Sequence, residues 1–138
     1  GDDDRGERPV GIGDQRLAAT FFKEINDRFG HLAGDKVIAQ VAKRLKESVR
    51  EYDLAFRYGG EEFLVALINT RQGEACAIAE RIRKSVEADD FQLANRKVTV
   101  SIGIATIPED GELETALAVA DTRLYAAKAA GRNICINA

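Results

Sequence analysis

The sequence predicts an α/β (α+β) domain in which helices cover a mixed β-sheet. Three observations predict this fold class. The chain has 138 residues, 45% of them hydrophobic, which is enough for one core and leaves little for a second domain. Apolar residues recur at helical spacing in several stretches, and short apolar or alternating runs separate these stretches. Strands that alternate with helices are typical of a sheet covered by helices.

The N-terminal part of the chain has the weakest pattern. Residues 1–20, GDDDRGERPVGIGDQRLAAT, are rich in glycine and charge and have no clear period. We therefore assign 1–20 as a divergent N-terminal segment and 21–138 as the domain. FFKEINDRF has apolar residues at positions 21, 22, 25 and 29, which predicts a helix. The sequence GHLAGD interrupts this helix, and the apolar stripe of KVIAQVAKRLKESV predicts a second helix over 36–49.

A hairpin and four further elements follow. The strand-like runs LAFRY and EEFLVALI, at 54–58 and 61–68, are separated by Gly59 and Gly60. Two glycines between such runs predict a β-hairpin. Beyond it, amphipathic and alanine-rich stretches alternate with β-branched or apolar runs. These predict helix 72–88, strand 97–107, helix 112–131 ending at Gly131, and strand 133–137.

Composition excludes several classes of protein. The net charge is −3 and the pI about 5.3, which disfavours DNA or RNA binding, since such proteins carry a positive surface. No apolar stretch approaches the roughly 18 residues of a membrane span, and no signal peptide is visible. We therefore expect no membrane segment and a cytoplasmic location. Cys76 and Cys135 form no CxxC motif, so we expect two small core residues in a reducing compartment.

The hairpin sequence RYGGEEF, residues 57–63, is the strongest candidate for a functional site. Glycines at a hairpin tip supply positive φ values and leave space for a ligand. Glu61 and Glu62 are adjacent, so in a strand they point to opposite faces. One carboxylate can hold a cation or activate a hydroxyl while the other orients or repels. The alternative is an ordinary Gly-Gly turn with two solvated glutamates.

Four motifs in order resemble those of the GGDEF-domain diguanylate cyclases, in the GGEEF variant. They are FKEINDRFGHLAGD, RYGGEEF, VTVSIGIA and LYAAKAAGRN, and the match runs from about Phe22 to Ile134. The resemblance implies a palm-like βααββαβ fold related to adenylate cyclases and polymerases. It also implies bacterial signalling by condensation of two GTP molecules into cyclic di-GMP, with Mg²⁺ or Mn²⁺, in a homodimer whose subunits each hold one GTP.

The resemblance assigns the catalytic roles to the hairpin. Glu61 matches the metal ligand, and Glu62 the adjacent acid that helps to deprotonate the attacking hydroxyl. Gly59 and Gly60 make room for the nucleotide. This assignment fits nucleotidyl transfer, in which carboxylate-bound cations neutralise phosphate charge and lower the pKa of the attacking hydroxyl.

Substrate-binding residues follow from the same resemblance. Asn26 and Asp35 match the pair that reads guanine, and an amide and a carboxylate suit the donors and acceptors of its edge. Without the family, Asn26 is a helix-surface or capping residue and Asp35 the N-cap of helix 36–49. His31 is expected to be structural. The residues that match phosphate contacts are Phe21, Phe22, Lys23, Lys128 and Arg132; the last two also suit a solvated helix terminus.

A second site is predicted upstream of the hairpin. Arg50 and Asp53 form an RxxD motif nine residues before the Gly-Gly pair, and Arg81 lies on the following helix. In the family this spacing marks the inhibitory site for cyclic di-GMP, and arginine forks suit its phosphates and guanine faces. The alternative is a surface salt bridge.

The sequence departs from the family before the first helix. Ala18 stands where the family has its first metal-binding Asp, Thr20 stands at the second Asp, and the LTGLxNR motif is absent. Asp14 is the nearest upstream carboxylate and would need a four-residue shift to serve. Either the chain binds GTP or cyclic di-GMP with little or no turnover, or the N-terminal segment pairs as an irregular strand and recruits Asp14.

These observations leave three hypotheses about function. The first is a diguanylate cyclase domain with product inhibition. The second is a catalytically impaired GGDEF-like domain that binds GTP or cyclic di-GMP as a receptor, which Ala18 favours. The third is an interaction domain without nucleotide affinity, which the retained Asn26, Asp35, Lys128 and Arg132 disfavour.

Overall fold

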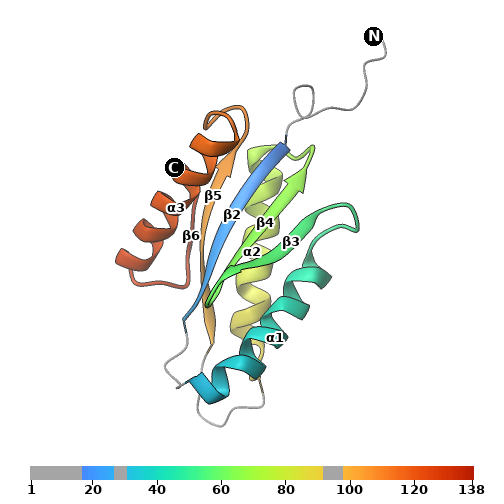
Figure 1. Cartoon of the computed structure of the whole chain (residues 1–138), viewed down its shortest axis with the longest axis vertical. Helices are drawn as coiled ribbons and strands as arrows, with labels where there is room; N and C mark the ends of the chain where they lie inside the picture. The colour runs from blue at the N-terminus through green and yellow to red at the C-terminus, as the bar shows by residue number, and fades with distance from the viewer. Residues whose placement is uncertain (1–16, 27–30, 92–97) are drawn as a thin grey trace.

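In the described part of the chain, five strands form a sheet with helices on both faces (Figure 1). The structure, a computed structural model, describes residues 17–26, 31–91 and 98–138, with backbone alone for 17–26, 31–34 and Gly59. Its elements, in chain order, are β2 (Leu17–Asn26), α1 (His31–Ser48), β3 (Leu54–Gly59), β4 (Glu62–Ile68), α2 (Gln72–Ala88), β5 (Thr99–Thr106), α3 (Leu113–Ala129) and β6 (Cys135–Ile136).

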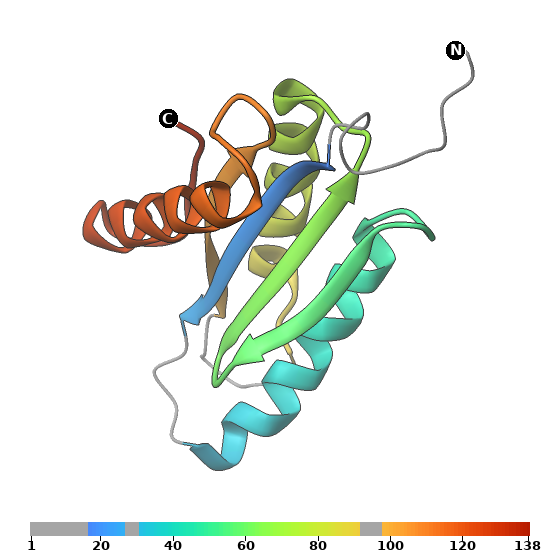
Figure 2. The same ribbon diagram turned by 45° about the horizontal axis from the view of Figure 1, so that its top comes forward.

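The sheet is mixed, as the sequence predicts. Its strand order is β3-β4-β2-β5-β6, and every neighbouring pair is antiparallel except β5 and β6, which are parallel. Figure 2 shows α1 and α2 behind this sheet and α3 on the opposite side. The predicted fold class is therefore confirmed.

Two apolar clusters hold the helices on the sheet. The larger cluster joins α1 and α2 to one face through side chains such as Val41, Ile82 and Ile102. The smaller cluster seats α3 on the other face and includes Leu64 and Leu124. Burial of apolar side chains at about 25 cal/mol per Å² is the main stabilising contribution of both clusters.

Close contact between α3 and β5 depends on Gly103. A Cβ atom at this position would lie 2.1 Å from the carbonyl oxygen of Ala120 and 2.3 Å from the backbone nitrogen of Leu124. Both are backbone atoms of α3, which cannot turn aside as the end of a side chain can. The glycine in VTVSIGIA therefore fixes how closely α3 lies on the sheet.

The predicted helix over residues 21–29 is wrong in its described part. Residues 17–26 form β2, which lies at the centre of the sheet and pairs with both β4 and β5. Residues 27–30 lie outside the described residues. Without β2, the facing N–H and C=O groups of β4 and β5 would lack partners, and this need outweighs the helical spacing of FFKEINDRF. The palm pattern βααββαβ places two helices between its first two strands. Among the described residues, only α1 lies between β2 and β3.

Two differences in boundaries affect residues of the predicted site. Helix α1 begins at His31, so Asp35 lies inside the helix and is not its N-cap. The hairpin turn consists of Gly60 and Glu61 rather than Gly59 and Gly60, because Gly59 pairs with Glu62 after a register shift that follows Arg57. The Gly-Gly hairpin itself is confirmed, displaced by one residue.

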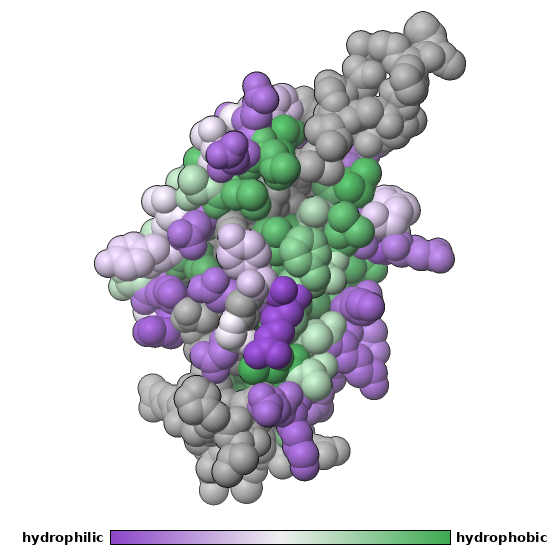
Figure 3. Space-filling view, in the orientation of Figure 1, coloured by the Kyte–Doolittle hydropathy of each residue, from purple (hydrophilic) through white to green (hydrophobic). Residues whose placement is uncertain are grey.

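The outer face of β3 is apolar and exposed. Leu54, Phe56 and Tyr58 alternate along the strand and are 55%, 48% and 57% exposed. Figure 3 shows hydrophobic side chains gathered over this part of the sheet. Helix α3 packs on β5 and β2 instead. This face therefore remains open to solvent.

Both cysteines carry free thiols and pack against the larger cluster while remaining half-buried. Burial raises the pKa of the Cys135 thiol to about 12. Within the described residues, no helix combines the length and the apolar character that a bilayer crossing requires.

Candidate nucleotide site

The tip of the β3–β4 hairpin is open and held in place by Arg57. The Nε–H group of Arg57 donates a hydrogen bond of 2.8 Å to the carbonyl oxygen of Gly60. Gly60 does not have a left-handed φ, and a Cβ atom there would meet no atom within 4 Å. The positive φ expected of this glycine is thus wrong. No atom of the described chain lies where a side chain at position 60 would begin, so the tip of the hairpin is open.

The two glutamates occupy different positions at this tip. Glu61 lies in the turn and is exposed, so the expected placement of both side chains in one strand is wrong. Glu62 is the first residue of β4, is half-buried and lies on the face of the sheet that carries Leu64 and α3. Glu61 is free to reach a ligand at the tip, while Glu62 lies at the beginning of the interior strand β4.

Backbone register joins the hairpin to the C-terminal turn across the sheet. Glu62 pairs with Glu24 of β2, and Glu24 pairs with Ser101 of β5. The hydroxyl of Ser101 accepts a hydrogen bond of 3.1 Å from the backbone N–H of Asn133. Adjacent strands lie about 4.8 Å apart, so two strand spacings, about 10 Å, separate the backbones of Glu62 and Ser101. The tip and the C-terminal turn therefore belong to the same end of the sheet.

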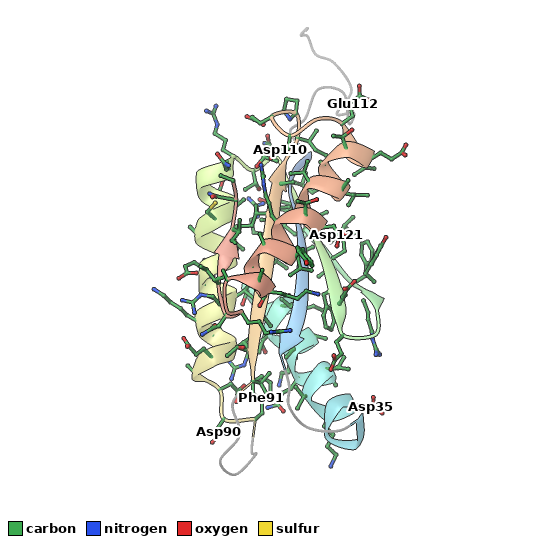
Figure 4. The ribbon with its side chains drawn as sticks, turned by 90° about the vertical axis from the view of Figure 1, so that its left-hand side faces the viewer. Asp35, Asp90, Phe91, Asp110, Glu112 and Asp121 are labelled. Carbon is green, nitrogen blue, oxygen red and sulfur yellow. The ribbon has the colours of Figure 1, made fainter. Side chains whose placement is uncertain are left out.

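A cleft lies between α1 and the hairpin on the opposite face. Its volume is about 510 Å³, within the range of small-ligand sites. Asp35 is an exposed carboxylate at its rim, and Figure 4 shows this residue at the lower end of α1. The other lining residues are Ile38, Ala39, Ala42, Leu45, Lys46, Ala55, Phe56, Arg57 and Phe63. An apolar cleft with a carboxylate at its rim can take a flat heterocycle that presents N–H donors.

Asn26, the expected partner of Asp35, is the last residue of β2 and pairs with Thr99 of β5. The pairing of Asn26 with Asp35 around a guanine base stays a prediction, because the described side chains include only Asp35 of the two. Phe21, Phe22 and Lys23 also lie in β2, where the structure describes the backbone, and their phosphate contacts stay predictions.

The C-terminal end of α3 forms a turn that carries the predicted phosphate-binding residues. Gly131 has a φ of 112°, and hydrogen bonds run from Gly131 N–H to Lys128 O at 3.2 Å and from Arg132 N–H to Ala127 O at 2.9 Å. This pair of bonds is a Schellman motif with glycine at the C′ position. The predicted stop at Gly131 is therefore confirmed. Lys128 is half-buried in the last turn of the helix, and Arg132 is exposed beyond it.

The RxxD motif forms a tight structural pair. Asp53 is buried and accepts hydrogen bonds from Nε and Nη2 of Arg50 at 2.8 and 3.1 Å, and from the backbone N–H of Arg50 at 2.9 Å. The N–H of Ile68 adds a fourth bond at 3.0 Å. Burial alone would raise the pKa of Asp53, but the hydrogen bonds from Arg50 and from the two backbone N–H groups outweigh it, and the pKa is lowered. The side-chain hydrogen bonds to Asp53 raise the pKa of Arg50.

Arg81 lies near this pair. Its Nη2 donates to the carbonyl oxygen of Ser48, two residues before Arg50, at 2.5 Å. The guanidinium of Arg50 lies 4.9 Å from the ring centroid of Tyr52, and its Nη1 lies 3.6 Å from a carboxylate oxygen of Glu74. The structure therefore brings Arg50, Asp53 and Arg81 to one region at the C-terminal end of α1, although most donors of Arg50 are already engaged.

Ala18 lies far along β2 from the residues that adjoin the hairpin tip. Ala18 lies in β2 beside Ala19, which pairs with Thr106, so it lies at the end of the strand away from Glu24. Asp14 lies outside the described residues. Among the described side chains, no group of three potential metal ligands exists. The carboxylates that the chain does present at the hairpin are oxygen donors of the kind Mg²⁺ prefers, and phosphate oxygens commonly complete such a site.

Comparisons with known proteins identify the family of the chain. The family profile described as "Diguanylate cyclase, GGDEF domain" matches residues 17–134. Diguanylate cyclase A of Treponema denticola is 44% identical over 131 residues, which cover 93% of this chain and 35% of that protein. Response regulator PleD of Caulobacter vibrioides is 46% identical over 121 residues, which cover 84% of this chain and 27% of that protein.

A solved structure has the same fold. The coiled coil and GGDEF domain of DgcB from Caulobacter crescentus, solved in complex with c-di-GMP, superposes with a TM-score of 0.81 at 26% identity. The match covers 91% of this chain and 71% of the DgcB chain. The chain described here belongs to the GGDEF domain family of diguanylate cyclases. It spans about a third of the length of the curated relatives it matches.

Proposed function

We propose that this chain is a diguanylate cyclase domain that condenses two GTP molecules into cyclic di-GMP. The observation that carries the proposal is the open hairpin tip, where Gly60 has no neighbour within 4 Å and the exposed Glu61 follows it. A nucleotide can approach the backbone of this turn closely. The cleft beside α1 accommodates the base, and the turn at Arg132 supplies a cation for the phosphates.

Each residue then has a defined task. Asp35, with Asn26, accepts hydrogen bonds from the N–H groups of guanine at the rim of the cleft. Lys128 and Arg132 neutralise phosphate charge from the end of α3. Glu61 holds Mg²⁺ or Mn²⁺, which when bound neutralises phosphate charge and lowers the pKa of the attacking 3′-hydroxyl. Glu62 accepts the proton from that hydroxyl as its oxygen attacks the α-phosphate and pyrophosphate leaves.

The reaction requires two copies of the chain. In the described residues, one chain offers one hairpin tip with one cleft beside it, whereas the product joins two GTP molecules. Two subunits facing each other, each with one bound GTP, bring the hydroxyl of one nucleotide to the α-phosphate of the other. The active form we propose is therefore a homodimer.

The decisive test is incubation with GTP and Mg²⁺, with the products separated by chromatography. We expect Glu61→Gln to reduce cyclic di-GMP formation by about 100-fold, since a lost charge contact at a reacting centre costs about two orders of magnitude in rate. Glu114→Gln, the same change at an exposed position on α3, is the matched control and should leave the rate unchanged. No product from the unchanged chain, at concentrations that force dimers, would contradict the cyclase proposal.

A second candidate function is a receptor for cyclic di-GMP with little or no turnover. Ala18 at the position of the first metal-binding Asp favours it. The basic region formed by Arg50 and Arg81 is the proposed binding site, with the buried Asp53 holding Arg50 in place. In the cyclase, cyclic di-GMP bound at this site would inhibit the enzyme. In the receptor, binding cyclic di-GMP at this site would be the only activity of the domain.

Arg81 is the most informative residue of this second site. Its only described hydrogen bond goes to the carbonyl of Ser48, so Arg81→Ala should leave the free energy of unfolding within about 0.5 kcal/mol of the parent value. We expect it to weaken cyclic di-GMP binding at least about tenfold, the effect of one lost charged hydrogen bond. Titration calorimetry measures both this loss and the smaller one expected for Arg81→Lys.

Activity separates the two functions. In the cyclase, Arg81→Ala should relieve product inhibition; in the receptor, it should only weaken binding. Lys43→Ala, which removes an exposed cation from α1, is the control. Unchanged affinity in Arg81→Ala would mean that the RxxD motif is a structural salt bridge.

A further inference from the structure

The C-terminal turn contains an unusual run of backbone conformations. Gly131, Arg132 and Asn133 have φ values of 112°, 67° and 53°. Glycine adopts the left-handed region without strain, whereas Arg132 loses about 1–2 kcal/mol there and Asn133 loses less, because asparagine visits this region more often than most residues. Two such residues in succession persist only where their surroundings hold them.

We propose that Asn133 is a positioning residue that holds Arg132 in place for the phosphates of the bound nucleotide. This inference rests on the proposed function, because the phosphate role of Arg132 belongs to it. Asn133 itself contacts no substrate in this proposal. Its role is to keep the turn in the left-handed conformation from which Arg132 projects.

Three hydrogen bonds anchor Asn133 to two different elements. Its Nδ2 donates to Oε2 of Glu87 at 2.7 Å, and its Oδ1 accepts from Nη1 of Arg83 at 3.0 Å. Its backbone N–H donates to the hydroxyl of Ser101, a residue of β5 with no exposed surface. The turn is thus tied to α2 on one side and to the sheet on the other.

The anchor on α2 is itself rigid. Arg83 is 14% exposed and makes two hydrogen bonds to Glu80, at 2.8 and 2.7 Å, besides its contact with Glu87 at 3.4 Å. The hydrogen bond from Arg83 holds the pKa of Glu80 at about 2, so this ion pair is intact throughout the neutral range. Asn133 therefore binds to a preformed arrangement of charges.

Arg132 lies between this anchor and the end of α3. The N–H of Arg132 bonds to Ala127 on the helix side, and Asn133 fixes the residue that follows. The backbone of Arg132 is thus held from both directions while its side chain is exposed. A cation presented in this way loses little backbone entropy when it binds a phosphate, which is the physical advantage of the anchor.

The direction of the Asn133–Glu87 bond allows a sharp test. In Asn133→Asp the donor is lost and two carboxylates face each other, so we expect the affinity for a non-hydrolysable GTP analogue with Mg²⁺ to fall about tenfold. In the double variant Asn133→Asp/Glu87→Gln, the new amide donates to the new carboxylate and Arg83 still has its acceptor. We expect this reversal to restore the affinity to within about twofold, measured by titration calorimetry. Asn133→Gly, which tolerates the left-handed φ but has no amide, should weaken binding without the repulsion.

A double-mutant cycle with Arg132 separates this inference from the function on which it rests. If Asn133 acts through Arg132, Asn133→Asp has no further effect on affinity in an Arg132→Ala chain. Fully additive losses, or no recovery in the reversed pair, would overturn the positioning role. An Arg132→Ala chain that binds the analogue as tightly as the parent would instead overturn the phosphate role of Arg132. Thermal unfolding of each variant confirms that the folded domain is being compared.

Discussion

Replacing Asp53 with alanine should lower the free energy of unfolding by about 3 kcal/mol or more, the usual cost of removing one partner of a buried ion pair. The side chain of Asp53 has no exposed surface and accepts four hydrogen bonds, three from Arg50 and one from the N–H of Ile68. In the variant, the guanidinium of Arg50 loses its carboxylate and the Ile68 N–H loses its acceptor.

Chemical denaturation followed by circular dichroism measures this loss. Asp121→Ala is the matched control, since Asp121 is an exposed aspartate on α3 (Figure 4) and should change the free energy of unfolding by less than about 0.5 kcal/mol. A loss of under 1 kcal/mol in Asp53→Ala would mean that the pair contributes little more than a surface salt bridge.

The contribution of Asp53 should also depend on pH. Its pKa is lower in the folded chain than the ordinary value of about 3.9 for an unfolded aspartate. The folded state therefore binds the proton less readily, and the stabilisation is complete above the unfolded pKa. It is lost as pH falls below about 4 and through the lower folded value, so the difference between parent and variant should shrink there. Asp53→Ala also removes a residue of the proposed cyclic di-GMP site. Arg81→Ala is therefore the cleaner probe of binding.

Gly103→Ala should destabilise the domain by about 3 kcal/mol, at the upper end of the cost of overpacking a core. The added Cβ atom would lie 2.1 Å from a backbone oxygen of α3 and 2.3 Å from a backbone nitrogen, so the helix must move away from the sheet. That movement separates Leu124 and Ala120 from their neighbours in the smaller apolar cluster. It also displaces Lys128, one helical turn beyond Leu124, and should weaken nucleotide binding.

Gly73→Ala is the control, and we expect it to stabilise the domain where Gly103→Ala destabilises it. Gly73 lies inside α2, and a Cβ atom there would meet no atom within 4 Å. Alanine favours the helix and reduces the entropy of the unfolded chain, so this variant should gain about 0.5–1 kcal/mol. Urea unfolding of both variants gives the comparison. A neutral Gly103→Ala would show that α3 moves on the sheet without loss.

Helices and strands whose apolar residues recur with a clear period could be predicted from the sequence. The strands around the hairpin, α2, β5, α3 and the stop at Gly131 follow from periodicity and from glycine, because local pattern and tertiary packing agree there. FFKEIN is the opposite case. The spacing of its apolar residues suits a helix, but the segment forms the strand between β4 and β5. A sequence pattern does not show that the backbone groups of β4 and β5 need this strand as a hydrogen-bonding partner.

The site was predicted as a set of residues and not as an arrangement. Glu61, Asp35 and Arg132 could be named from motifs, whereas the turn at Gly60–Glu61 depends on a register shift that no motif encodes. Asn133 was missed because residues 133–137 were predicted as one strand, whereas Asn133 has a φ of 53° and lies before β6, which begins at Cys135. A signal was present: an asparagine directly after Gly-Arg tolerates the left-handed region better than most residues, which points to a special turn.

Because the exposed face of β3 is apolar, self-association of the chain should depend on its small net charge. Leu54, Phe56 and Tyr58 offer an apolar surface on a strand at the edge of the described sheet. Repulsion between molecules that each carry a charge of −3 opposes contact between such faces. The charge vanishes near pH 5.3, and salt screens it within about 8–10 Å at physiological strength. Solubility should therefore be lowest in mildly acidic buffer and highest at alkaline pH and low ionic strength.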